Sequence, residues 1–187
     1  MSLKEDINFS LWCDFIERDF LETRFKEIIK KNIIQGATSN PAIFESSITN
    51  SLAYKQQLDM LQANNAKTIY EELALTDIKR AAALLTDLHK KDADDGFISI
   101  EVDPLLCDDA AGTIEEGVRL YSSINVDNVM IKIPATEAGY IAMRELTSKG
   151  INVNATLIFS PEQAIKCTQA LDEGIRDSNK DIKAVVS

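Results

Sequence analysis

The stretch that most restricts the possible folds lies at residues 128–139. Side chains alternate along a strand, so a strand over residues 129–133 would be apolar on both faces except at Lys132. A strand that is apolar on both faces is typical of a parallel sheet covered by helices. Thr136 then supplies an N-cap residue for a helix, which completes a strand-to-helix turn. The stretch therefore favours an α/β fold.

Lys132 can be interpreted in two ways. Removing its ammonium group from water would favour the neutral amine, which is a nucleophile. Alternatively, the side chain could extend to the rim of the sheet and keep its charge in water, which is the commoner situation for an isolated lysine in a strand. The polar residues that end the other predicted strands favour the nucleophile.

Strands and helices alternate along the rest of the chain. Five further strands are predicted, at residues 9–14, 33–38, 97–103, 151–157 and 182–186. Helical patterns separate them, including one near residues 21–31, a long one over residues 51–91, and one that starts at Ser160 with Pro161 and Gln163 behind it. This alternation, without a hairpin dipeptide or a repeat, indicates a series of βα units and a parallel sheet.

The series favours an eight-fold (β/α)8 TIM barrel. No glycine-rich nucleotide motif follows any strand, which argues against a doubly wound nucleotide-binding sheet. Typical barrels take about 250 residues, and this chain has 187. We therefore expect residues 1–187 to form a single barrel domain that covers about the first six βα units and is C-terminally incomplete.

Composition excludes several classes of function. The net charge of -10 makes binding to nucleic acid or to an anionic membrane unfavourable. Cys13, Cys107 and Cys167 are far apart, and His89 is the single histidine, so neither a zinc site nor a Ser-His-Asp triad is expected. No signal peptide or membrane-spanning stretch is visible, which predicts a cytoplasmic protein.

Polar side chains lie at or near the carboxyl ends of the predicted strands. These residues are Asp14, Asn40, Glu101, Lys132, Asn154, Thr156 and Ser187. Any one could be structural, for example a helix cap at Asp14 or an Asx turn at Asn40, but strand ends in a barrel meet at one mouth, where active sites are built. One amine among carboxylates, amides and hydroxyls suits Schiff-base carbonyl chemistry without a metal.

Two segments resemble the signatures of the transaldolase family. Residues 36–44 are similar to the first signature, and residues 129–139 are similar to the second, around the Schiff-base lysine. Residues 10–15, 98–104 and 150–161 also resemble the bacterial family in order and spacing. The resemblance implies a β/α barrel, no cofactor, and a role in the pentose phosphate pathway. A dihydroxyacetone unit would pass from sedoheptulose 7-phosphate or fructose 6-phosphate to glyceraldehyde 3-phosphate or erythrose 4-phosphate.

The resemblance also implies catalytic roles for individual residues. Lys132 would form the imine with the ketose phosphate. Glu101 and Thr156 would hold a catalytic water, and Asp14 would take the proton from the C4 hydroxyl during carbon–carbon cleavage. The related fructose-6-phosphate aldolases carry glutamine where Glu101 stands, so the resemblance implies that a glutamate there favours transfer over simple cleavage. A class I aldolase of that type is the alternative enzyme, and a non-catalytic sugar-binding barrel is the alternative outside catalysis.

The same resemblance implies a set of binding residues. Asn40 and Asn154 would hydrogen-bond substrate hydroxyls, with Asn154 also steadying Lys132, and Ser187 would contact the dihydroxyacetone end. The family's phosphate-binding arginine is expected a few residues beyond Ser187. Sugar phosphates are thus the expected partners, with a homodimer as a further possibility.

Overall fold

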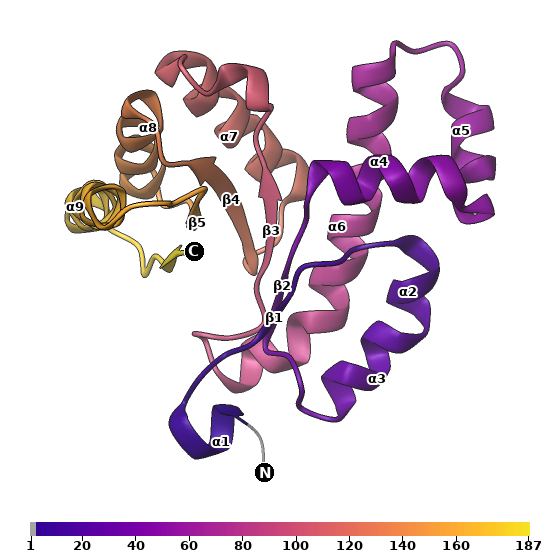
Figure 1. Ribbon diagram of the computed structural model, residues 1–187, viewed down its shortest axis with the longest axis horizontal. Helices are drawn as coiled ribbons and strands as arrows, with labels where there is room; N and C mark the ends of the chain where they lie inside the picture. Colours follow the sequence, from indigo (N-terminus) through magenta and orange to yellow (C-terminus); the bar gives the residue numbers. More distant parts are fainter. Residues whose placement is uncertain (1–2) are drawn as a thin grey trace. The chain divides into compact units, whose positions relative to one another are not determined.

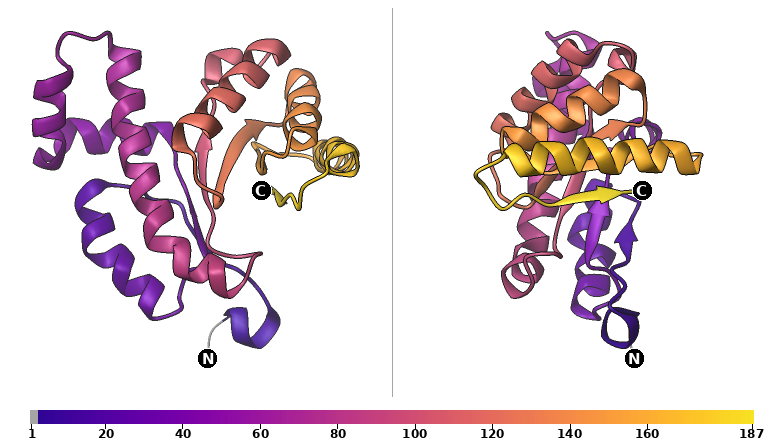
Figure 2. Two further views of the ribbon diagram at one scale, coloured as in Figure 1. Left: turned by 180° about the vertical axis from the view of Figure 1, so that it is seen from behind. Right: turned by 90° about the vertical axis from the view of Figure 1, so that its left-hand side faces the viewer.

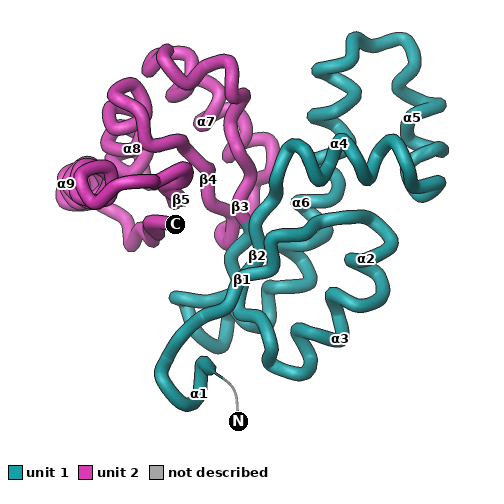
Figure 3. Tube along the Cα trace, viewed as in Figure 1, with its two compact units in different colours: residues 1–98 teal, residues 99–187 magenta. Residues whose placement is uncertain are grey.

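The computed structural model describes residues 3–187, and the chain divides into two compact units (Figure 3). Unit 1 covers residues 1–98 and contains α1 (Leu3–Ile7), β1 (Trp12–Cys13), α2 (Arg18–Glu22), α3 (Arg24–Lys30), β2 (Gly36–Thr38), α4 (Pro41–Asn50), η1 (Leu52–Tyr54), α5 (Lys55–Leu61) and α6 (Ala66–Lys91). Unit 2 covers residues 99–187 and contains β3 (Ile98–Glu101, whose first residue ends unit 1), η2 (Pro104–Leu106), α7 (Ala110–Ile124), β4 (Val129–Pro134), α8 (Glu137–Ser148), β5 (Val153–Thr156), α9 (Pro161–Asp177) and β6 (Ala184–Val186).

Parallel strands follow one another in sequence order within each unit. In unit 1, β1 pairs with β2, with Trp12 opposite Gly36. In unit 2, β4 lies between β3 and β5, and β5 pairs with β6. Six parallel strands that alternate with helices in this way correspond to the first six βα units of a (β/α)8 barrel, which confirms the predicted fold class. The expectation of a single domain stays a prediction.

The helices cover one side of the strands in each unit. In unit 1, α2, α3 and α6 lie on the same side of β1 and β2 (Figures 1 and 2). In unit 2, α7 packs against α8 and α8 packs against α9, so that the three helices form one layer beside the strands (Figures 1 and 2). None of the helices within residues 3–187 has both the length and the apolar character needed to cross a membrane.

The strand β4 is the buried centre of unit 2, as its apolar sequence predicts. All six of its residues are buried, and Val129, Ile131 and Ile133 are fully inaccessible. The helix α8 then starts so close to β4 that a Cβ atom at Gly139 would clash with the carbonyl oxygen of Pro134. A glycine is therefore needed there, because α8 packs directly over the end of the strand that carries Lys132.

Several predicted elements are shorter or more broken than the periodicity indicates. The first strand covers only Trp12–Cys13, and the helix expected near residues 21–31 is two helices, α2 and α3, separated at Thr23. Thr23 has φ -117° and ψ -95°, which lies outside the helical region. The long helical stretch is likewise divided, because Asn65 accepts a hydrogen bond from Thr68 N and starts α6 anew. The first break is one residue and the second covers residues 62–65, and neither disturbs the apolar pattern, so these breaks were not predicted.

Candidate active site

Lys132 lies on β4 inside unit 2 and faces a carboxylate. Its side chain is 11% exposed, so it does not extend into water, and the interpretation as a rim lysine is wrong. Its Nζ lies 3.7 Å from Oε2 of Glu101, the last residue of β3, whose side chain is 13% exposed. Neighbouring strands of the buried sheet thus place an amine and a carboxylate beside each other.

The separation of these two groups determines what they can do together. At 3.7 Å, Nζ and Oε2 form an ion pair but are too far apart for a direct hydrogen bond. Across such a gap, one water molecule can contact both groups. The attraction is also stronger here than at the surface, because little solvent screens it. The pair can therefore hold a water and pass protons through it.

The next strand carries a chain of polar side chains into the same unit. Asn154 lies opposite Lys132 in the pairing of β4 with β5. It is 2% exposed, its Nδ2 donates to Ser99 Oγ at 3.2 Å, and its Oδ1 accepts from Ser187 Oγ at 2.9 Å. The Ser187 main chain is held as well, because its N–H donates to Ala155 O at 2.8 Å. Hydrogen bonds to Ser99 and Ser187 thus fix the orientation of the Asn154 side-chain amide.

Thr156 is the last residue of β5 and lies opposite Pro134. It is 6% exposed, and its carbonyl oxygen accepts a hydrogen bond from Ala135 N at 2.9 Å. The loop after β4 and the loop after β5 therefore meet at Thr156. Five of the seven predicted site residues belong to unit 2, and they lie within β4 and β5, at the ends of β3 and β5, or directly after β6.

The other two predicted residues belong to unit 1 and lie at strand ends there. Asp14 follows β1 directly and is exposed. It does not cap α2, because Glu17 does so by accepting from Asp19 N and Phe20 N. Asn40 does cap α4, with its Oδ1 accepting from Ala42 N at 2.9 Å, so the structural role considered for it is real. The convergence of Asp14 and Asn40 with the residues of unit 2 stays a prediction.

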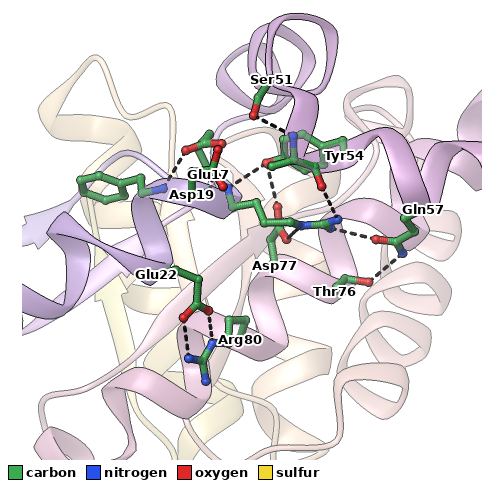
Figure 4. Close-up of polar contacts among 12 residues, drawn as sticks. Glu17, Asp19, Glu22, Ser51, Tyr54, Gln57, Thr76, Asp77 and Arg80 are labelled. Carbon is green, nitrogen blue, oxygen red and sulfur yellow. Dashed lines mark hydrogen bonds and ion pairs between the residues drawn. The ribbon is translucent and has the colours of Figure 1, made fainter.

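A buried network in unit 1 fixes the start of α2, just after the loop that carries Asp14. Arg18 Nε donates to Asp77 Oδ1 at 2.9 Å, and the Tyr54 hydroxyl donates to Asp77 Oδ2 at 2.8 Å (Figure 4). The Arg18 guanidinium also lies 4.5 Å from the centre of the Tyr54 ring. Burial raises the pKa of Asp77 and the pKa of Tyr54, while the Arg18 charge acts on Asp77 in the opposite direction. The loop that carries Asp14 is thus held in place where it joins α2.

Comparison with known proteins identifies the family. The model of the Transaldolase/Fructose-6-phosphate aldolase family matches residues 11–187. The chain belongs to this family. A transaldolase of Campylobacter jejuni subsp. jejuni serotype O:23/36 (strain 81-176) is 53% identical over 173 residues, which are 92% of this chain and 53% of that protein. A transaldolase of Helicobacter pylori (strain Shi470) is 52% identical over 163 residues, which are 87% of this chain and 52% of that protein. The chain spans about half the length of these relatives.

In this member of the transaldolase/fructose-6-phosphate aldolase family, Ser99 joins the predicted site residues. Ser99 is fully buried and accepts the hydrogen bond from Asn154. The sequence pattern could have identified Ser99, because Ser99 and Glu101 lie on the same face of the predicted strand. Within residues 3–187, no group of three or more His, Cys, Asp or Glu side chains could hold a metal ion.

Proposed function

We propose that this protein is a transaldolase that transfers a dihydroxyacetone unit from a ketose phosphate to an aldose phosphate through an imine on Lys132. The observation that carries the proposal is the enclosed Lys132 amine, 3.7 Å from the Glu101 carboxylate, in a chain of this family. The relatives from C. jejuni and H. pylori are themselves named transaldolase.

The first half of the proposed reaction forms the imine. Lys132 Nζ, in its neutral form, adds to the C2 carbonyl carbon of the ketose, and the resulting hydroxyl leaves as water. Glu101 and Thr156 move the protons through a water held between them, which suits the gap of 3.7 Å beside the amine. The product is an iminium ion, which withdraws electrons from the adjacent carbon–carbon bond.

The second half cleaves and remakes a carbon–carbon bond. Asp14 takes the proton of the C4 hydroxyl, the C3–C4 bond breaks, and its electron pair moves into an enamine on Lys132. The aldose leaves, an acceptor aldehyde enters, and the enamine attacks its carbonyl carbon. Asp14 returns its proton to the new hydroxyl, and water then hydrolyses the imine. Asn40 and the Asn154–Ser187 pair would hold substrate hydroxyls, because each presents amide or hydroxyl groups at a strand end.

A class I aldolase of the fructose-6-phosphate aldolase type is the second candidate, since the family model covers both activities. The two differ in whether the dihydroxyacetone unit is released or transferred. An assay of fructose 6-phosphate with and without erythrose 4-phosphate separates them. A transferase turns over only with the acceptor, whereas an aldolase releases dihydroxyacetone without it. The cytoplasmic location and the homodimer stay predictions.

Trapping the imine tests the proposal directly. Borohydride added with fructose 6-phosphate should reduce the imine to a stable amine and leave a covalent adduct on Lys132, seen by peptide mass spectrometry. Lys132→Met should give no adduct, while Lys166→Met, which alters an exposed lysine paired with Glu137, should still be labelled. An adduct on a different lysine, or equal labelling of Lys132→Met, would contradict the assignment.

A further inference from the structure

The loop between β5 and α9 contains a residue in an unfavourable backbone conformation. Leu157 has φ 59°, and the other non-glycine residues with positive φ in residues 3–187 are Asn8, Asn32 and Asn125. Asparagine tolerates this left-handed region, and Asn125 uses it to end α7, which is a common arrangement. Leucine has no such tolerance, and Leu157 follows a strand instead of a helix. Local turn chemistry therefore does not account for Leu157.

Burial of its own side chain does not hold Leu157 in place either. Leu157 remains 51% exposed, so only part of its apolar surface is removed from water. A strained backbone persists only where surrounding interactions determine it, and such strain is concentrated at functional sites. The interactions that hold Leu157 must therefore come from its neighbours.

A closed set of three hydrogen bonds surrounds Leu157, and we call it the Gln163 clasp. Ala135 N donates to Thr156 O at 2.9 Å, Gln163 Nε2 donates to Ala135 O at 3.1 Å, and Phe159 N donates to Gln163 Oε1 at 2.9 Å. The clasp therefore ties down the residues on both sides of Leu157 and joins them to Ala135, the residue directly after β4. Both the nitrogen and the oxygen of the Gln163 side-chain amide therefore form hydrogen bonds.

This arrangement differs from the one expected from the sequence. A glutamine at the third position of a helix normally reaches back to the N–H of the N-cap residue, here Ser160. Gln163 instead bonds Phe159, one residue earlier, and reaches across to the neighbouring loop. Ser160 still caps α9, since its Oγ accepts from Gln163 N at 3.1 Å. The side chain of Gln163 thus does more than start a helix.

We propose that Gln163 is a positioning residue that holds Leu157 in its left-handed conformation and thereby fixes Thr156 at the end of β5. The proposal rests on the transaldolase function proposed above, in which Thr156 helps to hold the catalytic water. Thr156 and Leu157 share a peptide bond, so a change of φ at Leu157 turns the plane that carries the Thr156 carbonyl. Without the Gln163 clasp, the carbonyl group and the side chain of Thr156 are no longer held beside Ala135.

The test compares two variants at the start of α9 in the full chain. Gln163→Met removes both side-chain hydrogen bonds, and we expect kcat to fall about 10- to 100-fold, the loss that a misplacement of about 1 Å can cause. KM should change little, because Lys132 and Asn154 are not moved. Ser160→Ala, the matched control, weakens the same helix start but leaves the clasp in place, so it should lower Tm and not kcat.

A rescue variant separates positioning from simple loss of stability. Asparagine adopts positive φ at Asn8, Asn32 and Asn125, so Leu157→Asn should restore kcat in the Gln163→Met background without restoring Tm. If Gln163→Met does not fold, Gln163→Glu, which keeps the acceptor and loses the donor, replaces it in the same comparison. Wild-type kcat in the Gln163 variant, or no recovery with Leu157→Asn, would overturn the proposal.

Borohydride trapping keeps this proposal distinct from the proposed function. We expect Gln163→Met to form the adduct on Lys132 while turning over slowly, because the lysine lies on β4 and not in the clasp. Absence of the adduct in the wild type would reject the transaldolase mechanism itself. Normal trapping and normal turnover in Gln163→Met would reject only the role of Gln163.

Discussion

At the residue scale, the proposed chemistry depends on a carboxylate whose position the structure describes closely. Glu101 ends β3 with its Oε2 3.7 Å from the Lys132 amine, and its side chain is 13% exposed. A carboxylate in this position can accept and return protons during imine formation, whereas an amide cannot. The difference between Glu101 and a glutamine of the same shape is therefore a difference in proton transfer, with little effect on packing.

Glu101→Gln should accordingly lower turnover far more than it weakens substrate binding. We expect kcat to fall by about 10²–10⁴, the usual contribution of a general acid–base group. The remaining activity should shift from transfer towards aldol cleavage, measured as dihydroxyacetone released without an acceptor. Glu116→Gln is the control, because Glu116 is a buried carboxylate of unit 2 that contacts Asp103 N and Arg119. Full transfer activity in Glu101→Gln would make Glu101 a structural residue.

At the scale of elements, an ion-pair cluster joins three helices of unit 1. Glu22, at the end of α2, pairs with Arg80 on α6 (Figure 4). It also pairs with Lys26 on α3. Hydrogen bonds from Arg80 and then from Lys26 lower the pKa of Glu22 to about 2. The side chain of Glu22 is 46% exposed, so solvent and salt screen much of this interaction.

The lowered pKa of Glu22 gives the pH dependence a definite direction. A carboxylate that is more acidic in the folded chain adds stability above its ordinary pKa of 4.5, and this stability is lost as the pH falls through about 2. Glu22→Gln should therefore lower the free energy of unfolding at pH 6 in low salt, less at high salt, and hardly at all near pH 2. Urea unfolding at each pH measures this effect. An exposed carboxylate, Glu27, is the control, and equal losses in Glu27→Gln would contradict the pairing.

At the scale of the whole molecule, the boundary between the two units falls inside a strand. Residue 98 closes unit 1 and residue 99 opens unit 2, and both belong to β3. We expect the full chain to unfold in one cooperative transition, because neither unit can unfold without breaking the strand that it shares. Scanning calorimetry should then give equal calorimetric and van't Hoff enthalpies.

Substitutions in each unit make this prediction sharper. Leu146→Ala leaves a cavity at a fully buried position in unit 2 and should lower the free energy of unfolding by about 2–5 kcal/mol. Tyr54→Phe removes the hydroxyl bonded to Asp77 in unit 1 and should cost about 1–3 kcal/mol. Both substitutions should lower the midpoint temperature of the same unfolding transition. Two transitions, each moved by only one of the substitutions, would show that the units are separate domains.

Local patterns were enough to predict the architecture. The apolar run of β4 predicted a strand covered on both faces, and the alternation of strands and helices predicted the parallel series, because side-chain period and burial are properties of short segments. The positions of Glu101, Lys132 and Asn154 on three successive strands followed from the same reasoning. The breaks at Thr23 and at residues 62–65 did not, since the backbone can leave the helical conformation without changing the apolar pattern.

The chain by itself thus determined the family, the fold class and the types of functional group at the strand ends. Tertiary structure decided which of these groups touch: that Glu101 lies 3.7 Å from Lys132, and that Ser99 holds Asn154. It also decided that the amide of Gln163 serves the neighbouring loop. The physical reason is that such contacts join residues far apart in sequence, and their geometry depends on how strands pair and loops pack.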